Sequence, residues 1–245
     1  MAFPTVPVLD SGAGSNGALG APWSASRLWT GQLALQRISN LIGAGSADDN
    51  NWYDAFIAAT VAAGKSQGYV KIDNRSPITG AEVNQYFRVT NPATGGPTAY
   101  YVGFTRGSAG AATLKIHRLV AGSDTTLATL TTQPVADGDW IGWECNGTNP
   151  VIIDVYYRAA AGSWGSTPVL TYSDSNAARL NPGTSYFGLE IQVDSCRLSN
   201  FAASLADNVT LSLTGLASTN ALGGTSASPN SPGSGKNKML TMMGA

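Results

Sequence analysis

The sequence predicts an all-β protein in which two antiparallel sheets pack face to face as a sandwich. Apolar and polar residues alternate with a period of two in the segments 99–106, 112–120, 125–133, 139–145, 151–159 and 184–193. Such alternation is typical of strands with one buried face. Turn-forming clusters such as RGSAG, AGSD and ADGD separate these segments, which begin about every dozen residues. Regular short strands without intervening helices favour a sandwich.

The stretch 47–64, ADDNNWYDAFIAATVAAG, permits two interpretations. Its alanines allow a helix, but Gly64 ends it and the strand pattern resumes at once, so we expect a strand. Cys145 falls on the inner face of the strand predicted at 139–145. A buried free thiol is favoured there, and a disulfide with Cys196 is the alternative.

Composition excludes several classes of partner. Charged residues make up 12% of the 245 residues and the net charge is −1, so no basic surface for nucleic acid is expected. No apolar run approaches the length of a membrane span. The first ten residues lack the basic and apolar regions of a secretory signal.

The composition changes after Asp207 and divides the chain into a β-sandwich at 1–207 and a Gly/Ser-rich tail at 208–245. One further strand fits the segment NVTLSLTGLA, and 223–237 has the composition of a flexible linker. The end of the tail is predicted to be an assembly or docking element, with a frayed terminus as the alternative. Its docking residues are Lys236, Lys238, Met239, Leu240, Met242 and Met243.

Asp10, Asn16-Gly17, Leu19-Gly20 and Trp23 together resemble the entry strand of concanavalin A-like (laminin G-like) jelly-roll domains. That opening is often D-x-F-x-x-x-N-G-x-L-G-x-x-W, and here Ser11-Gly12 replaces the aromatic position. Segments 136–147, 151–159 with 168–174, and 184–193 with 193–204 then follow the order of the family. The resemblance covers roughly 5–207. It implies that the first and last strands lie side by side, so that Asp10 meets 194–201, and that Trp23 belongs to the core.

The tail segment 209–228, VTLSLTGLASTNALGGTSAS, is similar to short repeats of bacteriophage virion proteins, of the form V-x-L-T-G-x-x-A-T-x-x-L-G. We therefore expect a non-enzymatic structural virion protein: a capsid decoration protein, a head fibre or a tail component. Its partners would be other virion proteins and further copies of itself in a homo-oligomer. It would be made in the host cytoplasm and lie on the virion surface, with an extracellular location as the alternative.

Glycan binding is the most common non-enzymatic use of the resembled family. A host-surface polysaccharide is therefore an expected partner, and a stand-alone carbohydrate-binding module is the alternative function. Exposed aromatic rings are the expected platforms, although core packing or a subunit contact explains each of them equally well. The candidates are Trp52, Tyr101, Tyr156, Trp164 and Tyr186.

No catalytic residues are assigned, and a divergent glycoside hydrolase is the third interpretation. Glucan hydrolases of this fold carry E-x-D-x-x-E on one strand, whereas Glu82, Glu144 and Glu190 are far apart in the sequence. Glu144 and Glu190 could still face each other across strands. His117, between Lys115 and Arg118, is interpreted as a solvated strand residue, and no G-x-S-x-G nucleophile motif exists.

No cofactor is expected, with calcium as the alternative. The segment DDNNWYD offers the clustered oxygen atoms of Asp48, Asp49 and Asp54. It lacks the spacing of an EF-hand, and a polar turn is the other interpretation.

Overall fold

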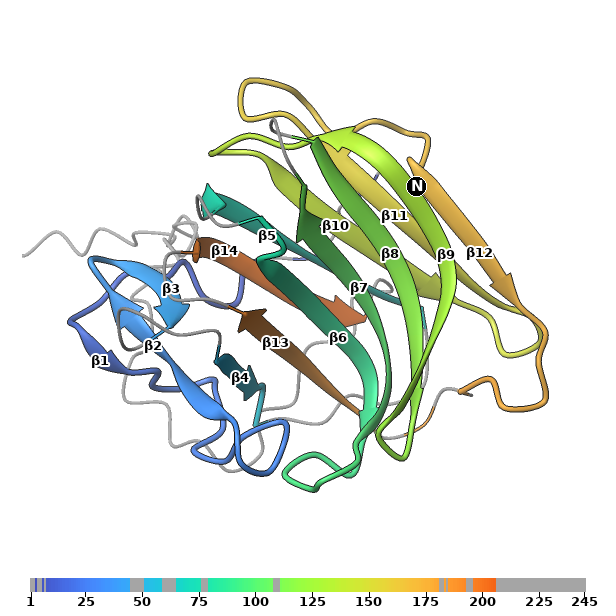
Figure 1. Cartoon of the computed structure of the whole chain (residues 1–245), viewed down its shortest axis with the longest axis horizontal. Helices are drawn as coiled ribbons and strands as arrows, with labels where there is room; N and C mark the ends of the chain where they lie inside the picture. The colour runs from blue at the N-terminus through green and yellow to red at the C-terminus, as the bar shows by residue number, and fades with distance from the viewer. Residues whose placement is uncertain are drawn as a thin grey trace, which may run out of the picture. The chain divides into compact units, whose positions relative to one another are not determined.

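The computed structural model describes residues 3, 6, 8–44, 51–58, 65–75, 79–107, 111–180, 183, 185–192 and 196–205. Within these ranges the chain forms fourteen β-strands and no helix (Figure 1). The predicted docking residues of the tail, the strand expected after Asp207, and Asp48 and Asp49 lie outside the described residues. No helix in the described part of the chain is long and apolar enough to cross a membrane.

The strands form two sheets, each antiparallel between neighbours. Sheet I runs in the order β12 (Leu170–Asp174), β11 (Val151–Arg158), β10 (Trp140–Asn146), β5 (Ser66–Arg75), β14 (Cys196–Leu205), β3 (Leu41–Ala44), β2 (Leu33–Ile38) and β1 (Gly17–Ala18). Sheet II runs in the order β4 (Trp52–Phe56), β13 (Tyr186–Gln192), β6 (Glu82–Thr90), β7 (Thr98–Arg106), β8 (Ala111–Val120) and β9 (Ser123–Pro134). A short parallel pairing of β2 with β4 joins the two sheets into one hydrogen-bonded path.

The hydrophobic core lies between the inner faces of the two sheets. Trp143 of sheet I stacks on Phe87 of sheet II with ring centroids 4.1 Å apart, and Phe187 lies 5.8 Å away. Gln85 of sheet II donates a hydrogen bond to the backbone oxygen of Ile141 of sheet I, at 3.2 Å. These contacts confirm the predicted two-sheet sandwich. On each strand, every second side chain points into the space between the sheets and fills the core.

The indole of Trp143 needs a glycine on the neighbouring strand. Gly68 is its partner across the β10–β5 pair. A Cβ atom at Gly68 would lie 2.6 Å from Cζ2 of Trp143 and 2.8 Å from the backbone oxygen of Ala202. The largest side chain of the core therefore occupies the space that the missing Cβ leaves.

The segment at Asp10 lies beside the last described strand of the sandwich, as the resemblance implied. The backbone nitrogen of Asp10 donates to the oxygen of Phe201 at 3.1 Å, and the nitrogen of Phe201 donates back at 2.8 Å. The Asp10 carboxylate accepts hydrogen bonds from Trp23 at 2.6 Å and from Arg37 at 2.9 and 3.0 Å. Trp23 is buried against Phe201, which confirms that it is a core residue.

Two further predictions are confirmed. Residues 52–56 form strand β4, so the strand interpretation of the ambiguous stretch holds for its described part. Cys145 and Cys196 are both buried free thiols, and Cys145 faces the core as the alternation predicted.

Candidate functional site

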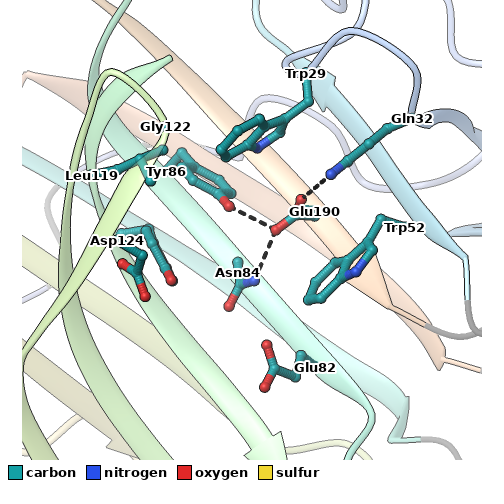
Figure 2. A pocket seen from close by; sticks show the side chains of 11 residues that line it. Trp29, Gln32, Trp52, Glu82, Asn84, Tyr86, Leu119, Gly122, Asp124 and Glu190 are labelled. Atoms are coloured by element: carbon teal, nitrogen blue, oxygen red, sulfur yellow. Dashed lines mark hydrogen bonds between the residues drawn. The ribbon is translucent and has the colours of Figure 1, made fainter. Parts of the chain in front are cut away.

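The outer face of sheet II carries a pocket of about 250 Å³ (Figure 2). Alternate residues of the strands point away from the core, and on β6 these are Glu82, Asn84 and Tyr86. Neighbouring strands and two loops complete the lining, with Trp52 from β4, Glu190 from β13, Tyr101 from β7, Leu119 from β8, Asp124 from β9, and Trp29, Gln32 and Gly122 from loops.

Glu190 lies at the centre of a hydrogen-bonded floor. Its Oε1 atom accepts from Nε2 of Gln32 at 2.9 Å, and its Oε2 atom accepts from Nδ2 of Asn84 at 2.8 Å and from the hydroxyl of Tyr86 at 2.7 Å (Figure 2). Three donors suit an ionised carboxylate, which only accepts. Burial nevertheless raises the pKa of Glu190, and the three donors oppose that shift. The floor is therefore rigid and carries negative charge at its centre when Glu190 is ionised.

Trp29 forms a wall of the pocket because Asp54 holds its loop. Oδ1 of Asp54 accepts from the backbone nitrogen of Leu28 at 2.7 Å, and Oδ2 accepts from that of Trp29 at 2.9 Å. Asp54 was a candidate calcium ligand, but both of its oxygen atoms bind this backbone. Among the residues that the structure describes, no three His, Cys, Asp or Glu side chains are grouped to hold a metal ion. Calcium at 48–54 stays a prediction.

His117 is not the solvated residue that the sequence suggested. Its ring stacks on Tyr101 with centroids 4.4 Å apart and planes 5° from parallel, and the residue is 7% exposed. Its Nδ1 atom lies 2.9 Å from Oδ2 of Asp124. Burial lowers the pKa of His117, against the raising effect of Asp124. The solvation prediction was wrong because Tyr101, the partner of His117 across the β7–β8 pair, covers the imidazole.

The five predicted aromatic platforms do not gather at one place. Trp52 and Tyr101 line the pocket. Tyr186 lies on the same sheet but packs edge-on against Phe56, with centroids 5.3 Å apart, and is not part of the lining.

Tyr156 and Trp164 belong to a cluster over sheet I instead. Phe3 stacks on Tyr156 at 4.2 Å and meets Trp164 edge-on at 4.8 Å. Tyr69 and Trp140 complete the cluster, which is separate from the pocket. Phe3 thus covers two of the rings that the sequence offered as platforms.

Glu144 and Glu190 do not face each other. Glu144 lies on β10 of sheet I, where its carboxylate pairs with Lys65 at 2.9 Å. Glu190 lies on β13 of sheet II. Both side chains alternate with core residues, so they point to opposite outer faces of the sandwich.

Several pocket residues were missed by sequence reasoning, namely Trp29, Gln32, Glu82, Asn84, Tyr86 and Asp124. The alternation in 82–87 carries a signal for three of them, since Val83 and Phe87 are apolar and buried whereas Glu82, Asn84 and Tyr86 share the other face. Trp29 and Gln32 come from an irregular loop, for which no periodic pattern exists.

Comparisons with known proteins support the fold. No family model matches the chain, and no curated protein matches its sequence. It is similar in structure to a legume lectin-like domain from Entamoeba histolytica, with TM-score 0.51, 9% identity, 71% of this chain and 88% of that one covered. It is also similar to a protein of unknown function with a galectin-like fold from Bacillus subtilis, with a TM-score of 0.51 and 11% identity. The match covers 77% of this chain and 96% of that one. A third similar structure is the VIP36 exoplasmic/lumenal domain in its Ca²⁺/Man-bound form, with a TM-score of 0.51 and 12% identity. The match covers 72% of this chain and 82% of that one. The chain thus has the predicted jelly-roll fold of concanavalin A-like proteins.

Proposed function

We propose that the protein is a non-enzymatic, lectin-like module that binds carbohydrate in the pocket of sheet II. The observation that carries this proposal is the combination of aromatic walls with a hydrogen-bonded polar floor. Trp29 and Trp52 lie on either side of Glu190 (Figure 2), and the rings of Tyr86 and Tyr101 also belong to the lining.

This arrangement matches the chemistry of a sugar. A pyranose presents C–H groups on its faces, which pack against aromatic rings, and hydroxyl groups at its edge, which need polar partners. Glu82, Glu190 and Asp124 supply acceptors beside the rings. The VIP36 domain of similar fold carries Man and Ca²⁺, which supports the same class of ligand for this chain.

A glycan array followed by isothermal titration calorimetry tests the proposal. Trp52→Ala is expected to weaken binding by about tenfold or more, because it removes one wall of the pocket. Trp164→Ala is the matched control, since it removes the same type of ring, an indole, from the cluster over sheet I instead of from the pocket. Loss of binding in Trp164→Ala with normal binding in Trp52→Ala would move the site to sheet I. An array without signal at high surface density would overturn the proposal.

The bound glycan is expected to remain intact. The carboxylates that the sequence offered as a catalytic pair, Glu144 and Glu190, point to opposite faces of the sandwich. Mass spectrometry of the glycan after prolonged incubation checks this, and cleavage that Glu190→Gln abolishes would favour the hydrolase interpretation.

A role as a structural bacteriophage virion protein is the second candidate, supported by the repeat pattern at 209–228 and the composition of the tail. In that role the module would attach the particle to host-surface polysaccharide, and the residues from Lys236 to Met243 would dock it or join copies of it. The native mass of the full chain, compared with that of a 1–207 truncation, tests the tail. A defined oligomer that only the full chain forms supports assembly through the tail, whereas two monomers contradict it.

A further inference from the structure

We infer that the pocket selects a sugar unit that carries a protonated amine over the same sugar with a neutral substituent. This inference rests on the proposed carbohydrate function and names the class of glycan. Its basis is the charge, the hydrogen-bond acceptors and the aromatic rings of the pocket lining.

The charge of the pocket is acidic. Three carboxylates, those of Glu82, Asp124 and Glu190, belong to its lining, and no lysine or arginine does among the described residues. Asp124 faces His117, whereas neither Glu82 nor Glu190 forms an ion pair within the described part of the chain. Glu190 is 3% exposed and meets only neutral donors. A charge that is largely removed from water and lacks a counter-charge favours a cationic ligand nearby.

The three carboxylates of the lining accept hydrogen bonds and therefore favour a donor-rich ligand. Because an ionised Glu190 only accepts, Gln32 must turn its NH₂ group toward Glu190. Two buried atoms of lining residues lack a hydrogen-bond partner among the described residues, namely the acceptor Oε1 of Gln32 and the donor Nε1 of Trp29. An ammonium group offers three donors and no acceptor, which suits the carboxylates of the lining.

The aromatic rings add attraction of the same sign. The face of an indole or phenol ring carries negative charge density and attracts a cation within about 6 Å of its centre. Trp29, Trp52 and Tyr101 all contribute to the lining. A neutral sugar gains only the packing part of this contact, and an acidic sugar is repelled by the three carboxylates.

Nearby cations do not reverse this field. Lys115 lies two residues before His117 on β8 and is outside the lining. Arg27 interacts with Asp54, which is turned to the loop backbone rather than to the pocket. The carboxylates therefore dominate the charge that a ligand meets.

Three β-1,4-linked tetrasaccharides that differ only at carbon 2 test the inference on the full-length protein. They carry an amine (glucosamine), an acetamide (N-acetylglucosamine) or a hydroxyl (cellotetraose), and isothermal titration calorimetry is run at a pH where the amine is protonated. The glucosamine tetramer is expected to bind about tenfold more tightly than cellotetraose. Glu82→Gln should remove most of that difference, and Glu144→Gln, a carboxylate on the opposite face, should leave it unchanged. Thermal unfolding of each variant shows whether it is folded.

The outcomes separate this inference from the proposed function. Equal or tighter binding of the acetylated or hydroxyl tetramer, lost in Trp52→Ala, overturns amine selection and keeps the carbohydrate function. Preference for the amine that Glu82→Gln does not reduce also overturns the assigned origin of the selectivity. Absence of binding to all three tetramers overturns amine selection, and the glycan array then decides separately whether the carbohydrate function also fails.

Discussion

The indole nitrogen of Trp23 donates to the Asp10 carboxylate at 2.6 Å, inside a cluster that ties the start of the chain to its last described strand. Arg37 from β2 binds both oxygens of the same carboxylate, and the backbone of Asp10 pairs with Phe201 of β14. One aspartate therefore joins the entry segment, β2 and β14. This explains why an uncharged, glycine-rich opening keeps a single acidic residue at position 10.

Asp10→Ala is expected to lower the free energy of unfolding by about 3 kcal/mol, because it leaves the guanidinium of Arg37 and the indole N–H of Trp23 without their partner. Urea unfolding followed by tryptophan fluorescence measures the change. Ser11→Ala, at the exposed neighbouring position, is the control and should stay within about 0.5 kcal/mol of the parent. An equally small effect of Asp10→Ala would contradict the role of this cluster.

Gly68→Ala is expected to destabilise the sandwich by about 1–3 kcal/mol, since its Cβ would overlap the ring of Trp143. Gly20→Ala is the matched control, because a Cβ there meets no atom within 4 Å and the backbone angle is ordinary. Thermal unfolding of the two variants compares them directly. Equal melting temperatures would show that the core adapts to the extra carbon without cost.

Both cysteines are expected to be unreactive in the folded protein. Burial raises the pKa of Cys145 and of Cys196 to about 12, so the reactive thiolate is scarce at pH 8, and both side chains are inaccessible. A disulfide-exchange reagent should therefore modify neither thiol in buffer and both in denaturant. Rapid labelling of the native protein would contradict the burial, and absence of labelling in denaturant would indicate a disulfide.

Phe3→Ala is expected to release the N-terminal segment from sheet I without altering the pocket. It removes the stacking on Tyr156 and the edge contact with Trp164, and it empties the space above Gly142. Tryptophan emission should shift to longer wavelength because Trp164 and Trp140 gain contact with water. Glycan affinity should not change, since the pocket lies on the other sheet. A loss of affinity in this variant would place the binding site over sheet I.

The strands that were predicted are those whose apolar and polar residues alternate in the sequence, whether the outer face is exposed or, as in β13, also buried. Segments such as 112–120 and 151–159 alternate because one face meets the core and the other meets water or polar neighbours. The hairpin at 33–44 was missed because its turn, Ser39-Asn40, lacks the Asn-Gly or Asp-Gly signal, although both residues adopt the positive φ angles of a two-residue hairpin. The strand at 82–90 was missed because Gln85, a polar residue on its core-facing side, interrupts the alternation between Val83 and Phe87.

The residues of the pocket could be predicted from the sequence less completely than the strands could. Trp52 and Tyr101 were among the predicted platforms, but nothing in the sequence excluded Tyr156, which lies outside the pocket. Its outward position on β11 was evident from alternation, whereas the covering ring, Phe3, comes from a segment far away in the sequence. Trp29 reaches the pocket because Asp54 of β4 and the backbone of residues 93–94 bind its loop, and such tertiary hydrogen bonds leave no periodic trace in a sequence.

The parallel pairing of β2 with β4 has a consequence for colloidal behaviour. Because it links the two sheets into one path, the ends of that path among the described strands are β12 and β9, and the two-residue β1 pairs beside β2. β12 is five residues long, and the pairing of β8 with β9 is interrupted by two register shifts. Short or irregular margins are poor templates for strand addition by another molecule. The net charge of the chain is −1, so electrostatic repulsion between molecules is weak. The short and irregular edge strands are therefore the feature that opposes fibrillar aggregation.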